Sequence, residues 1–313
     1  MTRLALAVDL GGTDLRAAIV DETGTVHAFA ATATDSRGGP EAVITQIVGL
    51  AARVRADAGQ AATVGVGVAA PGPLDPVAGV AIAPPTLHGW RDVPLAALLR
   101  ERLGQPVRLE NDANAAALGE WRFGAGRGTQ NMVFVTVSTG IGGGVIADGR
   151  LLHGRRGLAA EIGHMTIDRH ATESLFGGAC GAWEALASGT ALGRAATRRA
   201  AGPDGAHLRA LAGAGTVTAR HVAEAARQSD PLALALLAEQ AQLLGIGFVN
   251  LLHLYSPERL IVGGGLSAAL DLMQDEIART VHERALVAYR DVPIVAAALG
   301  GQAGLVGAAS LVF

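Results

Sequence analysis

The chain has 313 residues, of which 50% are hydrophobic, and a formal net charge of −3 at pH 7. This composition predicts a globular protein of about two domains and excludes an intrinsically disordered chain. The small net charge, without a long run of like charges, argues against nucleic acid as the main partner. The single cysteine, Cys180, excludes an intramolecular disulfide and favours a cytoplasmic location.

The basic side chains are all arginine, because the sequence contains 25 basic residues and no lysine. This excludes sites that need a lysine, such as a Walker A loop or a Schiff base. Phosphate charge would have to be met by backbone N–H groups, arginine or a metal ion. The first residues lack the features of a signal peptide, and glycine or polar residues interrupt every long apolar stretch. We therefore expect no membrane partner.

Residues 4–34 indicate three short strands in a meander, with a turn at residues 21–24. The motif Asp9-Leu10-Gly11-Gly12-Thr13 lies between the first two strands. A glycine loop between strands, with a carboxylate at its mouth, suggests a phosphate cradle with an acid that attracts a metal ion. Dinucleotide and Walker sites place a helix after the loop, so this layout argues against both. The motif predicts a phosphotransferase or a phosphohydrolase.

Helices and strands alternate in the next part of the chain. The last of these strands runs into Glu110-Asn111-Asp112, and α/β folds place reactive groups at the carboxyl ends of strands. Asp112 is a candidate general base for phosphoryl transfer to a hydroxyl, and Asn111 offers a donor and an acceptor to a polyol. The alternative is that Asp112 only caps the following helix. Apolar spacing predicts helices at residues 41–58, 94–103 and 113–121, and strands at residues 63–69 and 107–109.

The opening layout repeats at residue 132, where a strand over residues 132–138 leads into a glycine loop over residues 139–144. A strand follows at residues 145–147, so we expect two related lobes that each begin with a phosphate-facing hairpin. The predicted lobes are a small α/β lobe of residues 1–115 plus 301–313 and a large α/β lobe of residues 116–300 with a helical insertion. The remaining pattern predicts a largely helical stretch at 184–254, strands at 259–262 and 293–299, and helices at 271–285 and 304–311.

Glu161 and His164 lie three residues apart, and both side-chain types hydrogen-bond sugar hydroxyls. His164 is alternatively a metal ligand, and the pair is alternatively a surface acid beside a satisfied histidine. Glu184, taken alone, is typical of a solvated acid on a helix.

Two further stretches have open interpretations. Gly263-Gly264-Gly265 follows a strand, and it permits either close approach of a nucleotide to the backbone or only a tight turn. His153, Arg155 and Arg156 form a small basic cluster that could meet phosphate, although a solvated loop is the simpler interpretation.

Taken in order, these stretches resemble the ROK family of sugar kinases and repressors, especially its bacterial glucokinases. The resemblance covers nearly the whole chain, and its motifs are modest singly but specific as an ordered set. They are Asp9-Leu10-Gly11-Gly12-Thr13, Pro71-Gly72-Pro73-Leu74-Asp75, Gly89-Trp90-Arg91-Asp92-Val93-Pro94-Leu95, Glu110-Asn111-Asp112-Ala113-Asn114-Ala115, Ser138-Thr139-Gly140-Ile141-Gly142-Gly143-Gly144, Glu161-Ile162-Gly163-His164, Gly263-Gly264-Gly265 and Ala303-Gly304-Leu305-Val306-Gly307-Ala308-Ala309.

The resemblance implies an α/β, two-lobed actin/hexokinase-like (ribonuclease H-like) fold with a central cleft, which closes over ATP, Mg²⁺ and a hexose. Asp112 matches the family's catalytic base, and Asp9 matches the acid near the magnesium ion, which it would reach through water. Matches to the family's sugar-binding residues are Asn111, Glu161, His164 and Glu184. Matches to its nucleotide-binding positions are Gly11, Gly12, Thr13, Thr139, Gly140, Gly142, Gly264 and Gly265.

The family also implies a homodimer or homotetramer. Its repressors carry a helix-turn-helix domain before the phosphate strand, and this chain starts at that strand. We therefore expect a hexose partner and no nucleic acid.

The chain departs from the family in two places. The family's structural zinc is held by the histidine matching His164 and by a Cys-x-Cys-Gly-x-x-Gly-Cys motif, whose cysteine positions hold Leu175, Gly177 and Ala182 here. Zinc prefers four nitrogen or sulfur ligands, so we expect none. The loop over residues 169–181 is then either held by packing of residues such as Leu175 and Phe176 or mobile. The spacing of the donors that remain, His164, Asp168, His170 and Cys180, fits no usual zinc site.

The second departure is Thr86, where the family often has asparagine. Threonine keeps a hydroxyl but lacks the amide, which could shift the sugar preference.

The sequence leaves three hypotheses for function. The first is ATP-dependent phosphorylation of glucose to glucose 6-phosphate, and the second is a kinase for N-acetylmannosamine, fructose or allose. The third is a sugar-binding regulatory protein that has lost catalysis.

Overall fold

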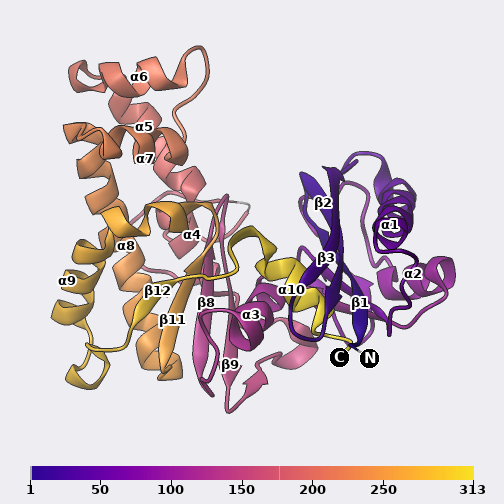
Figure 1. Ribbon diagram of the computed structural model, residues 1–313. Coiled ribbons are helices and arrows are strands. Elements are labelled where there is room, and N and C mark those ends of the chain that lie inside the picture. The colour runs from indigo at the N-terminus through magenta and orange to yellow at the C-terminus, as the bar shows by residue number, and fades with distance from the viewer. Residues whose placement is uncertain (1, 176) are drawn as a thin grey trace. The chain divides into compact units, whose positions relative to one another are not determined.

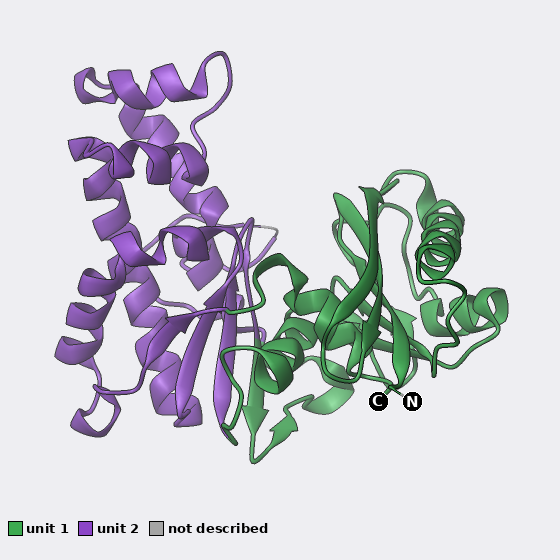
Figure 2. Cartoon of the chain, viewed as in Figure 1, with its two compact units in different colours: residues 1–130, 144–160, 298–313 green, residues 131–143, 161–297 purple. Residues whose placement is uncertain are grey.

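The computed structural model describes residues 2–175 and 177–313, which form two compact units (Figures 1 and 2). Unit 1 comprises residues 1–130, 144–160 and 298–313, and unit 2 comprises residues 131–143 and 161–297. Unlike the predicted small lobe, unit 1 includes residues 116–130 and 144–160. Helix packing places α3 (Asp112–Phe123) in unit 1: it lies so close to α10 (Ala303–Ala309) that a Cβ atom on Gly307 would overlap the Ala115 carbonyl oxygen.

Unit 1 is built on a five-stranded sheet in the order β3-β2-β1-β4-β7. The predicted meander is confirmed, since β1 pairs antiparallel with β2 and β2 pairs antiparallel with β3. β4 is parallel to both β1 and β7, which brings the carboxyl ends of these three strands to one edge. The strands are β1 (Leu4–Leu10), β2 (Asp14–Asp21), β3 (Val26–Ala33), β4 (Val66–Ala70) and β7 (Val107–Asn111).

The centre of this sheet is buried on both faces, because residues 5–8 of β1 are apolar and buried on both sides of the pleat, whereas alternate residues of β3 are exposed. Leu6 and Val8 join a core that includes residues of α1 (Gly39–Asp57) and α2 (Leu95–Leu103). Ala5 and Ala7 join a second core with residues of α10. Accordingly, α1 and α2 lie on one side of the sheet and α10 on the other (Figure 1). Smaller elements of unit 1 are β5 (Leu74–Asp75), β6 (Val80–Ala81), β10 (Arg150–Leu151) and the 3₁₀ turns Arg155–Gly157 and Gly300–Gln302.

A second five-stranded sheet has the order β10-β9-β8-β11-β12. Its central strands β8 (Met132–Val137) and β11 (Arg259–Gly263) are parallel, as are β11 and β12 (Ile294–Ala296). β9 (Ile141–Ala147) begins four residues earlier than the sequence predicts, so Gly142, Gly143 and Gly144 are strand residues and the loop is only residues 138–140. The glycine run is explained by packing: a Cβ atom on Gly144 would lie 2.6 Å from the Ala117 Cβ.

The helices of unit 2 are organised around α8 (Pro231–Tyr255), whose inner face is buried. Its Phe248 packs edge-on against Trp183 with ring centroids 5.7 Å apart. Within the described residues, α8 is the one helix whose length and composition would suit a membrane span, and 56% of the relevant window is buried inside the protein. The other helices are α4 (Trp183–Ala187), α5 (Gly189–Ala200), α6 (Ala206–Ala212), α7 (Ala219–Arg227) and α9 (Gln274–Arg284), with 3₁₀ turns at Ile162–His164, Pro203–Gly205, Gly265–Leu272 and Val287–Tyr289.

Candidate functional site

The first glycine loop is a tight turn between β1 and β2. The Gly11 N–H donates to the Asp14 carbonyl at 2.8 Å, and the Thr34 hydroxyl donates to the Gly11 carbonyl at 2.8 Å. Gly12 lies against Thr86, because a Cβ atom on Gly12 would be 2.6 Å from the Thr86 Cβ. Thr86, one of the two positions at which the chain departs from the family, therefore packs directly against this glycine loop. Thr13 is exposed at the tip of the turn.

Asp9 lies at the end of β1 with its side chain 20% exposed. Burial raises the pKa of this carboxyl, the Arg16 guanidinium opposes that rise, and the nearby Asp14 adds to it. The closest Arg16 nitrogen is 3.7 Å from the Asp9 carboxylate. A carboxylate oxygen is a ligand type that Mg²⁺ prefers, either directly or through bound water, so Asp9 fits the predicted role.

Asn111 and Asp112 lie at the same sheet edge as Asp9. Ala69 of β4 pairs with Asp9 on one side and with Glu110 on the other, so the phosphate loop and the candidate base are separated by one strand. Two strand spacings correspond to about 10 Å. The parallel β1-β4-β7 arrangement thus explains why residues far apart in the sequence share one edge.

The helix cap at this position is Asn111 and not Asp112. The Asn111 Oδ1 accepts the N–H groups of Ala113 at 2.9 Å and of Asn114 at 3.3 Å. Asp112 is the first residue of α3, it is exposed, and its Oδ1 accepts the Ala113 N–H at 2.8 Å. Because the cap occupies the Asn111 carbonyl oxygen, its Nδ2 is the part of the side chain left to donate to a substrate.

Glu161, His164 and Glu184 come together in unit 2. Glu161 precedes the 3₁₀ turn that carries His164, and Glu184 lies on α4. The His164 Nδ1 is 4.0 Å from the Glu184 Oε1, and the Ile141 N–H donates to the Glu184 Oε2 at 3.4 Å. The His164 side chain is 50% exposed, whereas that of Glu184 is 9% exposed. The cluster presents a half-exposed imidazole in front of a buried carboxylate.

The environment of Glu184 disfavours its negative charge, because the carboxylate is buried. Burial raises the pKa of its carboxyl; the Ile141 N–H and the His164 imidazole lower it, and the Glu161 carboxylate raises it. The solvated helix acid considered from the sequence is therefore wrong for Glu184. A buried carboxylate with few partners suits a site that awaits a hydrogen-bond donor.

The loop that follows His164 is held by backbone bonds and apolar packing. Leu175 is buried, as predicted, in a cluster with Ala182 and Ala185, whereas Phe176 lies outside the described residues. The Trp183 N–H donates to the Met165 carbonyl at 2.8 Å, and Thr166 bridges to Ala182. Two cysteine positions of the family's zinc motif are thus part of a small core.

The donors of this loop do not fit a zinc ion. Asp168 accepts the His170 N–H at 2.8 Å, and the Arg169 Nε donates to the His170 Nε2 at 2.9 Å. Over residues 2–175 and 177–313, no group of three or more His, Cys, Asp or Glu side chains could hold a metal ion. Cys180 is exposed.

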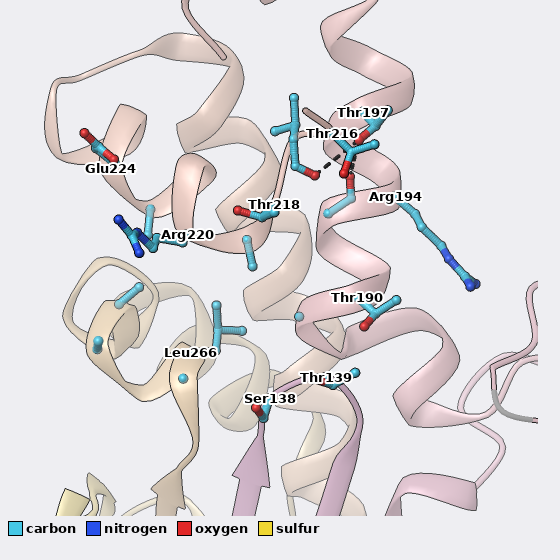
Figure 3. A pocket seen from close by; sticks show the side chains of 18 of the residues that line it. Ser138, Thr139, Thr190, Arg194, Thr197, Thr216, Thr218, Arg220, Glu224 and Leu266 are labelled. Atoms are coloured by element: carbon cyan, nitrogen blue, oxygen red, sulfur yellow. Dashed lines mark hydrogen bonds between the residues drawn. The ribbon is translucent and has the colours of Figure 1, made fainter. Parts of the chain in front are cut away.

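A cavity of about 1050 Å³ opens beside the second loop in unit 2. Ser138 and Thr139 lie at one end of it, and Thr197, Thr216 and Thr218 lie at the other (Figure 3). The Gly189 N–H donates to the Ser138 carbonyl at 2.8 Å, so the loop is anchored to the start of α5. The walls combine hydroxyl, arginine and apolar side chains.

The adjacent glycines Gly264 and Gly265 have different structural roles. Gly264 has φ +81°, and a Cβ atom there would lie 2.5 Å from the Val137 carbonyl oxygen. Gly265 lines the cavity, and a Cβ atom there would meet nothing within 4 Å. Gly264 thus shapes the backbone, whereas Gly265 leaves space.

Sequence reasoning missed the helical wall of the cavity. Its residues belong to α5, α7 and the segment between α6 and α7, where no glycine motif or acid pair marks them. The local signals are two helix caps: Ser188 caps α5 by accepting the Ala191 N–H at 3.1 Å, and Thr218 forms a capping box with His221 at the start of α7. The missed wall residues are Thr190, Arg194, Thr197, Arg198, Thr216, Thr218, Arg220 and Glu224.

Comparisons with known proteins agree over the whole chain. A model of the ROK family matches residues 5–313. The glucokinase of Streptomyces coelicolor is 40% identical over 98% of this chain and 97% of its own, and that of Thermotoga maritima is 36% identical over 98% and 96%. A ROK family glucokinase from Streptomyces griseus in complex with glucose and AMPPNP has a TM-score of 0.85 and 38% identity over 98% of both chains. These likenesses confirm the predicted family and the α/β actin/hexokinase-like fold.

Proposed function

This chain belongs to the ROK family, and on that premise we propose that it is an ATP-dependent hexose kinase that converts glucose to glucose 6-phosphate. One observation carries the proposal. The Asp112 carboxylate is exposed at the carboxyl edge of the β1-β4-β7 sheet, while Asn111 provides the helix cap. We therefore favour the general-base role of Asp112 over the capping alternative, because Asn111 supplies the N-cap of α3.

In the proposed reaction Asp112 is the general base. It accepts the proton of the sugar hydroxyl as the oxygen attacks the γ-phosphoryl group, which needs a carboxylate within about 3 Å of that hydroxyl. The Asn111 Nδ2 donates to a sugar hydroxyl, and Glu161, His164 and Glu184 bind others. A hydroxyl that donates to Glu184 would relieve the cost of its buried charge, which supports a polyol substrate.

ATP is the proposed phosphoryl donor, with its phosphates against the two glycine loops. Gly11, Gly12 and Thr13 supply the first loop, and Thr139 and Gly140 supply the second. Gly142 lies inside β9, so its proposed role is to let the strand pass close to the phosphates. Magnesium, held near Asp9, would neutralise charge that develops on the transferred group.

The cavity beside Gly265 suits the adenosine end of the nucleotide. Its volume of about 1050 Å³ is ample for a base and a ribose, and its hydroxyl side chains can hydrogen-bond both. The Streptomyces griseus structure contains AMPPNP, an ATP analogue, which supports ATP as the donor for this chain. We further propose a cytoplasmic homodimer or homotetramer without nucleic acid or membrane partners.

A coupled ADP-release assay across about ten sugars tests the function. Asp112→Asn should lower kcat by roughly 10²–10⁴-fold, because the amide cannot accept the proton. Asp57→Asn is the matched control, since Asp57 is an exposed aspartate at the end of α1. Near-normal turnover by Asp112→Asn, with the fold intact, would refute the mechanism.

A second candidate function differs only in the sugar. Thr86 replaces the asparagine that is frequent in the family and lies against Gly12, so the substrate could be N-acetylmannosamine, fructose or allose. The same sugar panel separates these substrates. Sugar binding by calorimetry without turnover of any sugar would instead support a regulatory protein.

A further inference from the structure

Glu110 is a buried carboxylate directly behind the proposed catalytic pair. It is 2% exposed, yet it lies at the end of β7 beside two residues that face substrate. Its Oε1 accepts the N–H of Asn111 at 2.9 Å and the Nδ2 of Asn114 at 3.0 Å. These two contacts hold the Asn111 backbone before Asp112 and the Asn114 side chain after it. The role assigned to Asn111 and Asp112 therefore depends on where the Glu110 side chain is held.

His153 holds the other oxygen of Glu110. It follows β10 in the segment 144–160 of unit 1, and its Nε2 lies 2.7 Å from the Glu110 Oε2. The hydrogen bond to Glu110 raises the pKa of His153, burial opposes the rise, and the Glu110 charge adds to it. The charged imidazole is thus favoured, and it is the partner that compensates the buried carboxylate. Without it, a buried charge would be left with fewer partners, which favours rearrangement.

We propose that His153 is a positioning residue for phosphoryl transfer, which fixes the turn that carries Asn111 and Asp112 by holding Glu110. The inference rests on the proposed function. Removal of the imidazole frees the Glu110 side chain, which loosens the Asn111 amide and the start of α3. A displacement of about 1 Å of a catalytic group can cost about 100-fold in rate.

The chain offers a matched control in a second histidine–carboxylate pair. The His27 Nε2 lies 2.8 Å from the Asp21 Oδ2, and its side chain is 45% exposed, compared with 46% for His153. The other contacts of Asp21 are with Thr23 and Thr25 in the turn between β2 and β3. Loss of His27 therefore removes a similar bond without touching a proposed site residue.

The experiment compares His153→Leu, His153→Gln and His27→Leu with the wild type. His153→Leu should lower kcat by about 10–100-fold and raise the KM for glucose, while the KM for ATP stays within about twofold. His153→Gln should recover most of the activity, because its amide nitrogen can still donate to Glu110. His27→Leu should lower Tm by about as much as His153→Leu does, and it should leave kcat and both KM values unchanged. Equal kinetics for His153→Leu and His27→Leu would overturn the proposal.

Hydrogen exchange without substrates provides a readout that does not need activity. Amide exchange over residues 107–118 should rise in His153→Leu and stay at the wild-type level in His153→Gln. If the wild type phosphorylates no sugar but this exchange pattern holds, the proposed function fails and the positioning role of His153 stands. Unchanged exchange in His153→Leu would overturn the positioning role in an active enzyme as well. If His153→Leu does not fold, His153→Asn replaces it, because its shorter amide cannot reach Glu110.

Discussion

Alanine substitution should lower stability at Gly264 and weaken ATP binding, without a loss of stability, at the adjacent Gly265. Gly264 has φ +81° and ψ 178°, a backbone region that is essentially restricted to glycine. An added Cβ atom would lie 2.5 Å from the Val137 carbonyl oxygen and 2.8 Å from the Thr136 Oγ1. The Thr136 hydroxyl can rotate away, but the Val137 carbonyl cannot yield without moving β8. At Gly265 the same Cβ atom would enter open space at the cavity wall.

The two structural terms at Gly264 set the size of the effect. The unfavourable backbone region costs about 1–3 kcal/mol, and overpacking against a backbone atom costs about 1–3 kcal/mol more. A total of about 2–6 kcal/mol corresponds to a fall in Tm of roughly 3–9 °C for a chain of this size. Gly265→Ala carries neither term, so its Tm should stay within about 1 °C of the wild type.

Thermal unfolding and ATP titration together separate the two glycines. Gly264→Ala should lose Tm, whereas Gly265→Ala should keep its Tm and raise the KM for ATP by about tenfold, since its methyl group enters the space proposed for the nucleotide. A Gly264→Ala protein as stable as the wild type would refute the conformational argument. An unchanged KM for ATP in Gly265→Ala would refute the placement of the nucleotide in this cavity.

Three further substitutions test the loop and two carboxylates. Leu175→Ala should lower the free energy of unfolding by about 2–3 kcal/mol, because it leaves a cavity in the small core of the loop. The chelator 1,10-phenanthroline should leave the wild-type Tm unchanged. A fall in Tm with the chelator would show that a metal ion holds the loop. Glu184→Gln should be more stable than the wild type above pH 4.5 and equally stable below it, because the folded state raises the pKa of this carboxyl above 4.5. Its KM for glucose should also rise, and the prediction fails if the gain in Tm is independent of pH. Asp21→Asn should be less stable than the wild type above pH 3.8, and the difference should vanish as pH falls to about 2. The reason is the pKa of Asp21, which burial raises but hydrogen bonds with Thr23, His27 and Thr25 lower to about 2 overall. A pH-independent difference in Tm would contradict that assignment.

The sequence was most informative where local pattern and tertiary role agree. The meander of residues 4–34 was predictable because β1 and β2 are apolar runs that lie buried in one sheet, and the strand that ends at Asn111 because its Val107 and Leu109 are buried. The motif at Asp9 and the one at Asp112 were placed at carboxyl ends of strands, and the parallel pairing through β4 brings both to one edge.

Other features could not be predicted from the sequence, because they depend on contacts with residues in other parts of the chain. Gly143 and Gly144 indicated a loop, but they lie in β9, where a Cβ atom would collide with Ile162 and Ala117. The choice of Asn111 over Asp112 as the helix cap depends on a single backbone conformation, with ψ 145° at Asn111. His153 was assigned to a basic loop because its partner, Glu110, is 43 residues away.

Every residue that lines the cavity belongs to unit 2, and this affects how the binding energy of the nucleotide contributes to catalysis. In the proposed placement, all contacts of the adenosine end lie within one unit, so we expect the nucleotide to bind with or without sugar and the kinetics to follow a random order. The adenosine end does not react, so these contacts would be made equally in the ground state and the transition state. Such uniform binding lowers the KM for ATP without raising kcat. We therefore expect rate acceleration to come from the two glycine loops and Asp112, where charge and proton would move.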